Sequence, residues 1–224
     1  MLYPIAPAPR QPDKIAFAIA EAGEAVTFSE LERRTNQAAR LFRARGIEQG
    51  DHIVLLAENC RQFLEICFAA DRAGIYYTAI STHATADEAA YIAAHCGAKL
   101  WVVSEAKAAI AETLITKLPH IRHRFMIGTP AGGCESWQAA AAAQSEEPIA
   151  DELQGLDMLY SSGTTGRPKG IRWQQTNEPP GRETMLVSLL GRLFGYTAET
   201  RYLSPAPLYH AAPLRHSMTV IKLG

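Results

Sequence analysis

Short apolar runs alternate with helical segments between residues 25 and 127, and this order constrains the fold more than any other feature of the sequence. Each apolar run has the length of a buried strand, whereas the segments between them repeat their apolar residues with a helical period. Strands separated by helices of this length indicate βαβ units. The sequence therefore predicts an α/β fold with a mostly parallel sheet and helices on both faces. Strands are expected at residues 25–28, 51–57, 75–80, 99–103 and 122–127, and helices at residues 29–46, 59–74, 86–96 and 105–118.

Two of these helices carry recognisable start signals. Ser29 followed by Glu32 fits a capping box, in which a hydroxyl and a carboxylate satisfy free backbone N–H groups. Asn59 follows a buried strand directly and is placed to cap the next helix. Later in the chain we expect a helix at residues 183–194, a strand at residues 201–204 and a helix at residues 213–223.

Residues 128–151 break the alternation, because they contain several glycines and prolines and an alanine-rich run at residues 138–144. Such a composition predicts a surface connection with one short helix. We take it as a subdomain junction and expect one α/β subdomain in residues 1–150 and the start of a second in residues 151–224. The prolines of residues 1–14 predict an extended N-terminal arm.

Composition excludes several classes of protein. Hydrophobic residues make up 47% of the 224 residues and charged residues 20%, which is ordinary for a folded domain and excludes wholesale disorder. With 22 basic against 23 acidic side chains, the chain favours neither nucleic acid nor an anionic membrane as its partner. No apolar run reaches transmembrane length, and no signal peptide is visible. The four cysteines form no C-x-x-C pair, so we expect a protein of the reducing cytoplasm, of unknown oligomeric state.

The segment from residue 160 to residue 170, Y-S-S-G-T-T-G-R-P-K-G, has the most specific composition in the chain. Its glycines and proline disfavour a helix or a central strand, while its hydroxyls, its backbone N–H groups, Arg167 and Lys169 suit an anion such as an oligophosphate. An exposed turn is the alternative, but a turn rarely needs so long a segment of this composition. The spacing excludes a Walker A loop, which requires G-x-x-x-x-G-K-[ST]. Strands are expected on both sides, at residues 155–160 and 170–173.

This segment closely resembles the phosphate-loop signature T/S-S-G-T-T-G-x-P-K-G of the acyl-adenylate-forming superfamily, which includes acyl- and aryl-CoA synthetases, luciferases and peptide-synthetase adenylation domains. Three further segments resemble the family, and the four matches occur in the expected order and cover nearly the whole chain. The three further segments are a G-D-x-V strand at residues 50–54, an asparagine-led helix and strand starting at residue 59, and a P-L-Y-H motif at residues 207–210. The chain resembles the N-terminal part of an AMP-forming acyl-CoA synthetase.

The resemblance implies a two-step reaction, in which a carboxylic acid, expected to be a fatty acid, attacks the α-phosphate of ATP and its acyl group then passes to coenzyme A. It implies Mg²⁺ that shares the charge of the phosphates, with Thr165 assigned to the metal through those phosphates, and a place for His210 in the acyl pocket. No residue of this chain is assigned a catalytic role. The positions that match phosphate-binding residues are Ser161, Ser162, Gly163, Thr164, Thr165, Gly166 and Lys169.

Two departures from the family pattern limit these expectations. The family's later adenine, ribose and hinge segments and its mobile C-terminal domain are absent from the 224 residues, which are therefore expected to be inactive alone. Residues 172–175, R-W-Q-Q, replace the usual small or apolar residues. Two alternatives stay open: a peptide-synthetase-type or aryl-acid adenylation domain, and a nucleotide-binding remnant without turnover.

Overall fold

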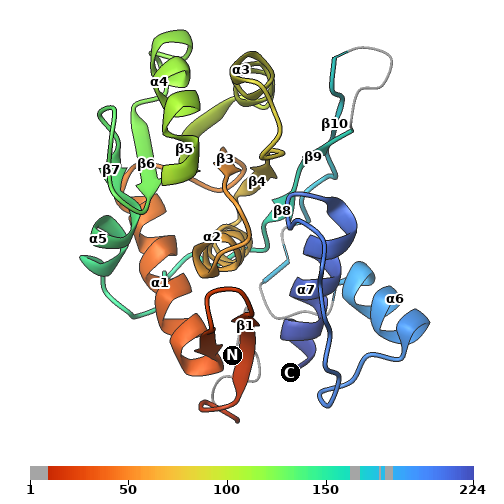
Figure 1. Cartoon of the computed structure of the whole chain (residues 1–224). Coiled ribbons are helices and arrows are strands. Elements are labelled where there is room, and N and C mark those ends of the chain that lie inside the picture. Colours follow the sequence, from red (N-terminus) through yellow and green to blue (C-terminus); the bar gives the residue numbers. More distant parts are fainter. Residues whose placement is uncertain (1–9, 162–166, 177, 180–183) are drawn as a thin grey trace.

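The computed structural model describes residues 10–161, 167–176, 178–179 and 184–224, and its centre is a six-stranded sheet (Figure 1). The strands lie in the order β7-β6-β5-β3-β4-β8, and every neighbouring pair is parallel. The predicted α/β fold with a mostly parallel sheet is confirmed. The strands are β3 (His52–Leu56), β4 (Tyr76–Ala79), β5 (Ala98–Ser104), β6 (His123–Ile127), β7 (Glu135–Ser136) and β8 (Leu156–Asp157).

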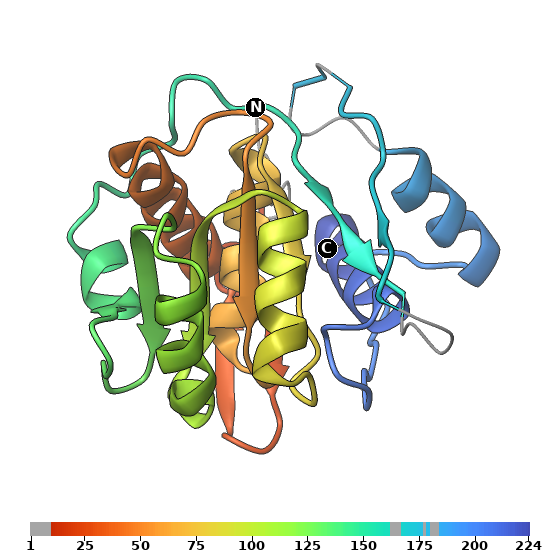
Figure 2. The same ribbon diagram turned by 90° about the horizontal axis from the view of Figure 1, so that it is seen from above.

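Helices cover both faces of this sheet, as Figures 1 and 2 show from two directions. Alternate side chains of a strand point to opposite faces, and β3 divides its residues between two cores accordingly. Ile53 and Leu55 pack in the core under α1, α2 and α5, whereas Val54 and Leu56 pack in the core under α3 and α4. The helices are α1 (Phe28–Ala44), α2 (Arg61–Arg72), α3 (Ala86–His95), α4 (Ala108–Lys117), preceded by the 3₁₀ turn Glu105–Lys107, and α5 (Trp137–Ala142).

Two small antiparallel hairpins and two further helices complete the described chain. The hairpin β1 (Ile15–Ile19) with β2 (Glu24–Thr27) packs beside α1, and β1 was missed by sequence reasoning. The second hairpin joins β9 (Leu159–Tyr160) to β10 (Gly170–Ile171). Helix α6 (Met185–Phe194) packs against α7 (Ala211–Leu223). Within the described ranges, no helix is both long and apolar enough to cross a membrane.

The predicted capping box of α1 is wrong. The cap is Thr27, whose hydroxyl accepts a hydrogen bond from the Glu30 backbone N–H at 3.2 Å. Glu32 does not reach back to the helix start, because its carboxylate pairs at 2.8 Å with the guanidinium of the fully buried Arg72. A buried cation requires a charged partner, and this requirement outweighs the local capping pattern.

The sheet continues past residue 150, because β8 pairs with β4. Gly155, just before β8, makes this approach possible: its N–H donates to the carbonyl of Asp71 at 2.5 Å. A Cβ at this position would lie 2.4 Å from the Ala70 carbonyl oxygen, so only glycine fits. The predicted short helix of the alanine-rich run is confirmed as α5, whereas residues 201–204, all of them described, are irregular, and the predicted strand is wrong. None of the described strands pairs with this segment, and its Leu203 side chain is exposed.

Candidate functional site

The predicted phosphate-binding segment begins and ends at the neck of the β9–β10 hairpin. Gly170 pairs with Tyr160 in the antiparallel register. Above this pair, the Ser161 N–H donates to the Lys169 carbonyl at 2.9 Å, and the Lys169 N–H donates to Ser161 Oγ at 3.2 Å. The structure thus brings together Ser161 and Lys169, both of them exposed. The other predicted phosphate-binding residues, Ser162, Gly163, Thr164, Thr165 and Gly166, lie outside the described residues.

The last glycine of the segment has a packing role. A Cβ on Gly170 would lie 2.5 Å from the Met158 methyl carbon and 2.9 Å from Cζ of the Tyr160 ring. Contacts this short do not occur, so a side chain at this position would displace the Met158 methyl group and the Tyr160 ring from the opposite strand. The need for glycine here therefore comes from the hairpin neck itself.

Helix α3 holds both sides of the neck. The Tyr160 hydroxyl lies 2.7 Å from Nδ1 of His95, the last residue of α3. On the other side of residues 162–166, the Arg167 guanidinium lies over the Tyr91 ring, 5.1 Å from its centroid. Burial raises the pKa of the Tyr160 phenol, so the hydroxyl keeps its proton at neutral pH. Sequence reasoning placed His95 correctly near the end of a helix and missed its contact with the segment.

His210 occupies the N-cap position of α7 and is exposed. Its N–H donates to the Pro207 carbonyl at 3.2 Å, and its ring centroid lies 4.5 Å from that of Tyr209. The ring makes no hydrogen bond that caps the helix. Its predicted place in an acyl pocket stays a prediction.

Asn59 holds the segment that precedes His210. Its Oδ1 accepts from the Leu208 N–H at 2.8 Å, and its Nδ2 donates to the Ala206 carbonyl at 3.2 Å. The prediction that Asn59 caps α2 is wrong, because Cys60 is the N-cap residue and forms no side-chain capping bond. The amide side chain instead ties the carboxyl end of β3 to the P-L-Y-H motif, far along the chain.

A partly buried ion pair connects α7 to the sheet. Arg215 forms two hydrogen bonds with Asp157 of β8, from Nε to Oδ1 at 3.2 Å and from Nη2 to Oδ2 at 2.7 Å. The hydrogen bond to Asp157 raises the pKa of Arg215 above its ordinary value. Asp157 itself is buried. A two-bond pair of this kind fixes direction as well as distance, so α7 and its N-terminal His210 have a defined orientation on the sheet.

Residues 172–175, which depart from the family pattern, make specific contacts. The Arg172 guanidinium lies 4.5 Å from the centroid of the Tyr76 ring. The Tyr76 hydroxyl donates to the Trp173 carbonyl at 2.8 Å and accepts from the Gln175 N–H at 3.1 Å. The Gln175 amide donates to the Gly74 carbonyl at 2.8 Å. The chain that leaves the hairpin is therefore fixed against the start of β4.

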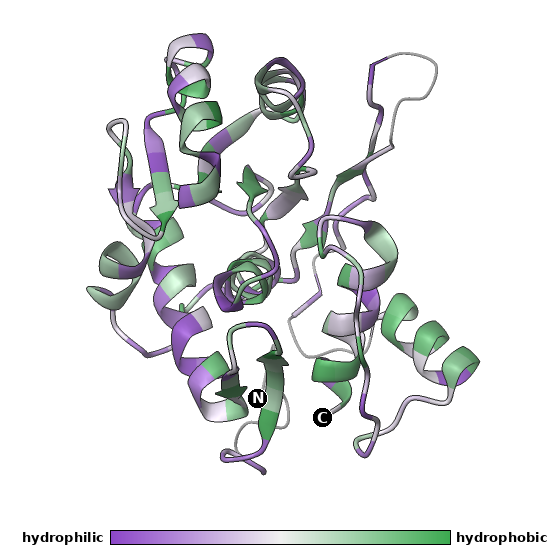
Figure 3. Ribbon diagram, in the orientation of Figure 1, coloured by the Kyte–Doolittle hydropathy of each residue, from purple (hydrophilic) through white to green (hydrophobic). Residues whose placement is uncertain are grey.

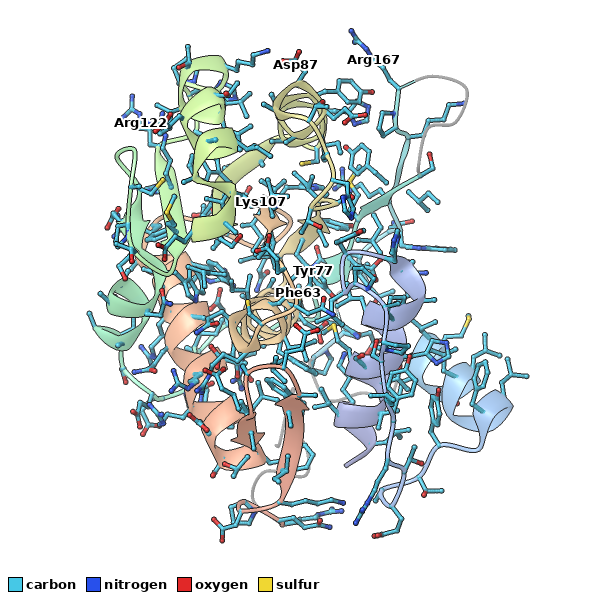
Figure 4. The ribbon with its side chains drawn as sticks, in the orientation of Figure 1. Phe63, Tyr77, Asp87, Lys107, Arg122 and Arg167 are labelled. Atoms are coloured by element: carbon cyan, nitrogen blue, oxygen red, sulfur yellow. The ribbon has the colours of Figure 1, made fainter. Side chains whose placement is uncertain are left out.

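A cavity of about 610 Å³ opens between β8, α6, α7 and the segment after the hairpin. Apolar side chains such as Tyr77, Trp173, Met185 and Met218 line most of it, and Figure 4 shows Tyr77 at the centre of the molecule. His210 and the hairpin neck do not line this cavity. No group of three or more His, Cys, Asp or Glu side chains suited to a metal occurs in the part of the chain that the structure describes.

Comparisons with known proteins agree with the motif order. A family model described as AMP-binding enzyme matches residues 6–224. A feruloyl-CoA synthase of Amycolatopsis sp is 30% identical over 203 residues, which cover 89% of this chain and 37% of that protein. A fatty acyl CoA synthetase of Mycobacterium tuberculosis superposes with a TM-score of 0.75 at 21% identity, over 97% of this chain and 41% of that one.

The ATP-bound MatB of Rhodopseudomonas palustris superposes with a TM-score of 0.70 at 26% identity, over 90% of this chain and 39% of that one. This chain therefore spans less than half the length of the three relatives. The match over residues 6–224 and the shared fold lead to one conclusion: the chain belongs to the AMP-binding enzyme family, the adenylate-forming ligases.

Proposed function

We propose that this chain carries the ATP-binding hairpin of an adenylate-forming ligase, which joins a carboxylic acid to coenzyme A through an acyl-adenylate. The observation that carries the proposal is the closed neck of the β9–β10 hairpin, where Ser161 and Lys169 lie side by side. The relatives named feruloyl-CoA synthase and fatty acyl CoA synthetase support a carboxylic acid as the second substrate, and a fatty acid is one candidate. The unpaired cysteines fit the proposed cytoplasmic location.

The donor set at the neck suits a triphosphate. Lys169 brings an exposed ammonium group, and Ser161 brings a hydroxyl that the neck already orients. When the α-phosphate is attacked, negative charge grows on the departing pyrophosphate, and positioned cations and N–H groups stabilise it. We assign this role to Lys169, together with Ser161 and residues 162–166. Attack on the α-phosphate releases pyrophosphate and leaves AMP joined to the acid.

Mg²⁺ would supply further charge neutralisation at the phosphates. The described residues offer no cluster of carboxylates or imidazoles for it, so we propose that the metal is held mainly by the phosphates themselves, with Thr165 as the proposed protein ligand. His210, at the N-terminus of α7, is the proposed neighbour of the acid. Asn59 positions the segment before it, and Arg215 positions the helix that follows it.

The test is equilibrium binding of MgATP to the chain and to the variant Lys169→Met. The variant keeps the length of the side chain and removes its charge. Hydrogen bonds that involve a charged group contribute more than neutral ones, so the dissociation constant is expected to rise about tenfold or more.

Lys99→Met is the matched control, because Lys99 is also exposed and its charge pairs with Asp51, which is not part of the hairpin. Its dissociation constant for MgATP should equal that of the unmodified chain. Equal affinities for the two variants would contradict the role of Lys169, and a chain that does not bind MgATP would contradict the proposed function.

A further inference from the structure

We propose that Tyr91 and His95 of α3 are positioning residues, which hold the two sides of the β9–β10 neck and thereby set the affinity of the hairpin for ATP. The consequence for ATP rests on the proposed function, whereas the anchoring itself does not. The two contacts are the His95–Tyr160 hydrogen bond at 2.7 Å and the Arg167–Tyr91 contact at 5.1 Å.

The hairpin needs external support because it is short. Strands β9 and β10 contain two residues each, and isolated two-stranded hairpins are marginally stable at best in water. The neck adds only the two hydrogen bonds between Ser161 and Lys169. Contacts with a rigid neighbour are therefore expected to decide how well the neck keeps its shape.

Helix α3 is such a neighbour. Its first turn carries a complete capping box, in which the Thr85 hydroxyl and the Glu88 carboxylate exchange hydrogen bonds with backbone N–H groups. Ala89, Ile92 and Ala93 bury its inner face in the core that also contains β3 and β5. The outer face, which meets the hairpin, is thus fixed relative to the sheet.

The two anchors lie one turn apart on this helix. Residues at positions i and i+4 share one face, and the ring centroids of Tyr91 and His95 are 5.4 Å apart. Within the predicted phosphate-binding segment, Tyr160 comes before residues 162–166 and Arg167 comes directly after them. One helix face therefore contacts the chain on both sides of residues 162–166, and it fixes the separation of Tyr160 and Arg167.

The experiment compares Tyr160→Phe with Tyr196→Phe. Both variants remove a hydroxyl that bonds Nδ1 of a histidine, because Tyr196 lies 2.8 Å from Nδ1 of His216, in a part of the molecule away from the hairpin. One neutral hydrogen bond corresponds to a change of about two- to tenfold in an equilibrium constant. Tyr160→Phe is expected to speed hydrogen exchange at the backbone N–H groups of Ser161 and Lys169 and to weaken MgATP binding by about this factor. Tyr196→Phe should change neither quantity.

Conservative variants separate positioning from a general loss of stability. Tyr91→Phe keeps the ring under Arg167 and is expected to retain the MgATP affinity that Tyr91→Leu loses, since the cation interacts with the ring face. His95→Asn places an amide near the position of Nδ1 and should retain more affinity than His95→Ala. Melting temperatures of the unliganded variants provide the stability readout.

The exchange rates and the MgATP affinities together decide whether α3 positions the hairpin for ATP. Faster exchange at the neck together with weaker MgATP binding in Tyr160→Phe supports the proposal. Identical behaviour of Tyr160→Phe and Tyr196→Phe overturns it, and so does faster exchange without any loss of affinity. If the unmodified chain does not bind MgATP, the proposed function fails, while the exchange rates at Ser161 and Lys169 still decide whether α3 holds the hairpin.

Discussion

At the residue scale, two glycines are required by close approach of other atoms. Gly170 leaves room for the Tyr160 ring, and Gly155 leaves room for the backbone of the neighbouring helix and strand. The packing role of these two glycines could not be predicted from the sequence, because a glycine next to a strand equally fits a turn or a bulge. The reason becomes visible only where Gly155 meets the carbonyl oxygens of Ala70 and Ile75.

Gly155→Ala is expected to lower the free energy of unfolding by about 3 kcal/mol, at the upper end of the usual cost of overpacking. Its Cβ would lie 2.4 Å and 2.5 Å from the two carbonyl oxygens, so the backbone must shift and weaken the bond to Asp71. Urea denaturation measures the change.

Gly191→Ala is the control. This position lies inside α6 and a Cβ there would meet only the Leu223 side chain, at 3.6 Å. The control should raise the free energy of unfolding by about 0.5–1 kcal/mol, because alanine is the better helix former. A Gly155→Ala variant as stable as the unmodified chain would contradict the packing explanation.

At the element scale, the stacked rings of His52 and Tyr76, at the start of β3 and β4, make the stability of the fold depend on pH. The His52 ring lies 4.7 Å from the Tyr76 ring, and its Nδ1 is buried with no partner among the described residues. Burial, and then the nearby Arg172 charge, lowers the pKa of His52 to about 4. An unfolded histidine takes up its proton near pH 6.5, so between pH 6.5 and pH 4 the unfolded chain binds more protons than the folded one. Stability must therefore fall as the pH falls through this window.

Between pH 7.5 and pH 5, His52 is expected to reduce the free energy of unfolding by about 2 kcal/mol or less. In His52→Phe this part of the pH dependence should disappear, because phenylalanine keeps the stacked ring and cannot be protonated. Urea denaturation at the two pH values measures the difference.

His83→Gln, at an exposed histidine before α3, is the control and should leave the pH dependence unchanged.

A carboxylate of α1 does not affect this comparison. Burial alone would raise the pKa of Glu30, but hydrogen bonds from Arg61 and Arg34 outweigh burial and lower it. The stability that Glu30 contributes is present above about pH 4.5 and is lost below it, outside the measured window. An unchanged slope in His52→Phe would exclude the histidine as its source.

At the scale of the whole molecule, α6 is apolar on two faces, as its colour in Figure 3 shows. Val187 and Leu190 are buried, whereas Met185, Leu189 and Leu193 are 85%, 56% and 69% exposed. Helices that are apolar all round are normally covered on every side, and large exposed apolar patches mark surfaces that bind other groups or associate. We expect this surface to dominate the solution behaviour of the chain.

The chain is therefore expected to bind a hydrophobic dye and to associate as its concentration rises. Leu189→Glu combined with Leu193→Glu should reduce dye fluorescence and association, measured by fluorescence and by sedimentation. Leu203→Glu, at a residue 79% exposed outside α6, is the control and should have little effect. Equal dye binding by all three proteins would show that α6 is not the surface responsible.

Much of the fold follows from local signals. The strands and helices between residues 25 and 127 were predicted correctly because their apolar periods reflect burial on one or two faces. Strand β1 was missed, since its I-A-F-A-I pattern is short and rich in alanine. The division into residues 1–150 and 151–224 stays a prediction.

The sequence by itself determined the α/β alternation, the hairpin segment and its family, because each depends on residues that are neighbours in the chain. Only the tertiary structure decided which contacts the side chains of Asn59, His95 and Arg215 make. Their partners lie 149, 65 and 58 residues away, and no local pattern encodes contacts over such separations. The same polar side chains would satisfy a helix cap, a helix end or an exposed surface equally well. Packing around the sheet brings these distant partners within reach, and it thereby selects one role for each side chain.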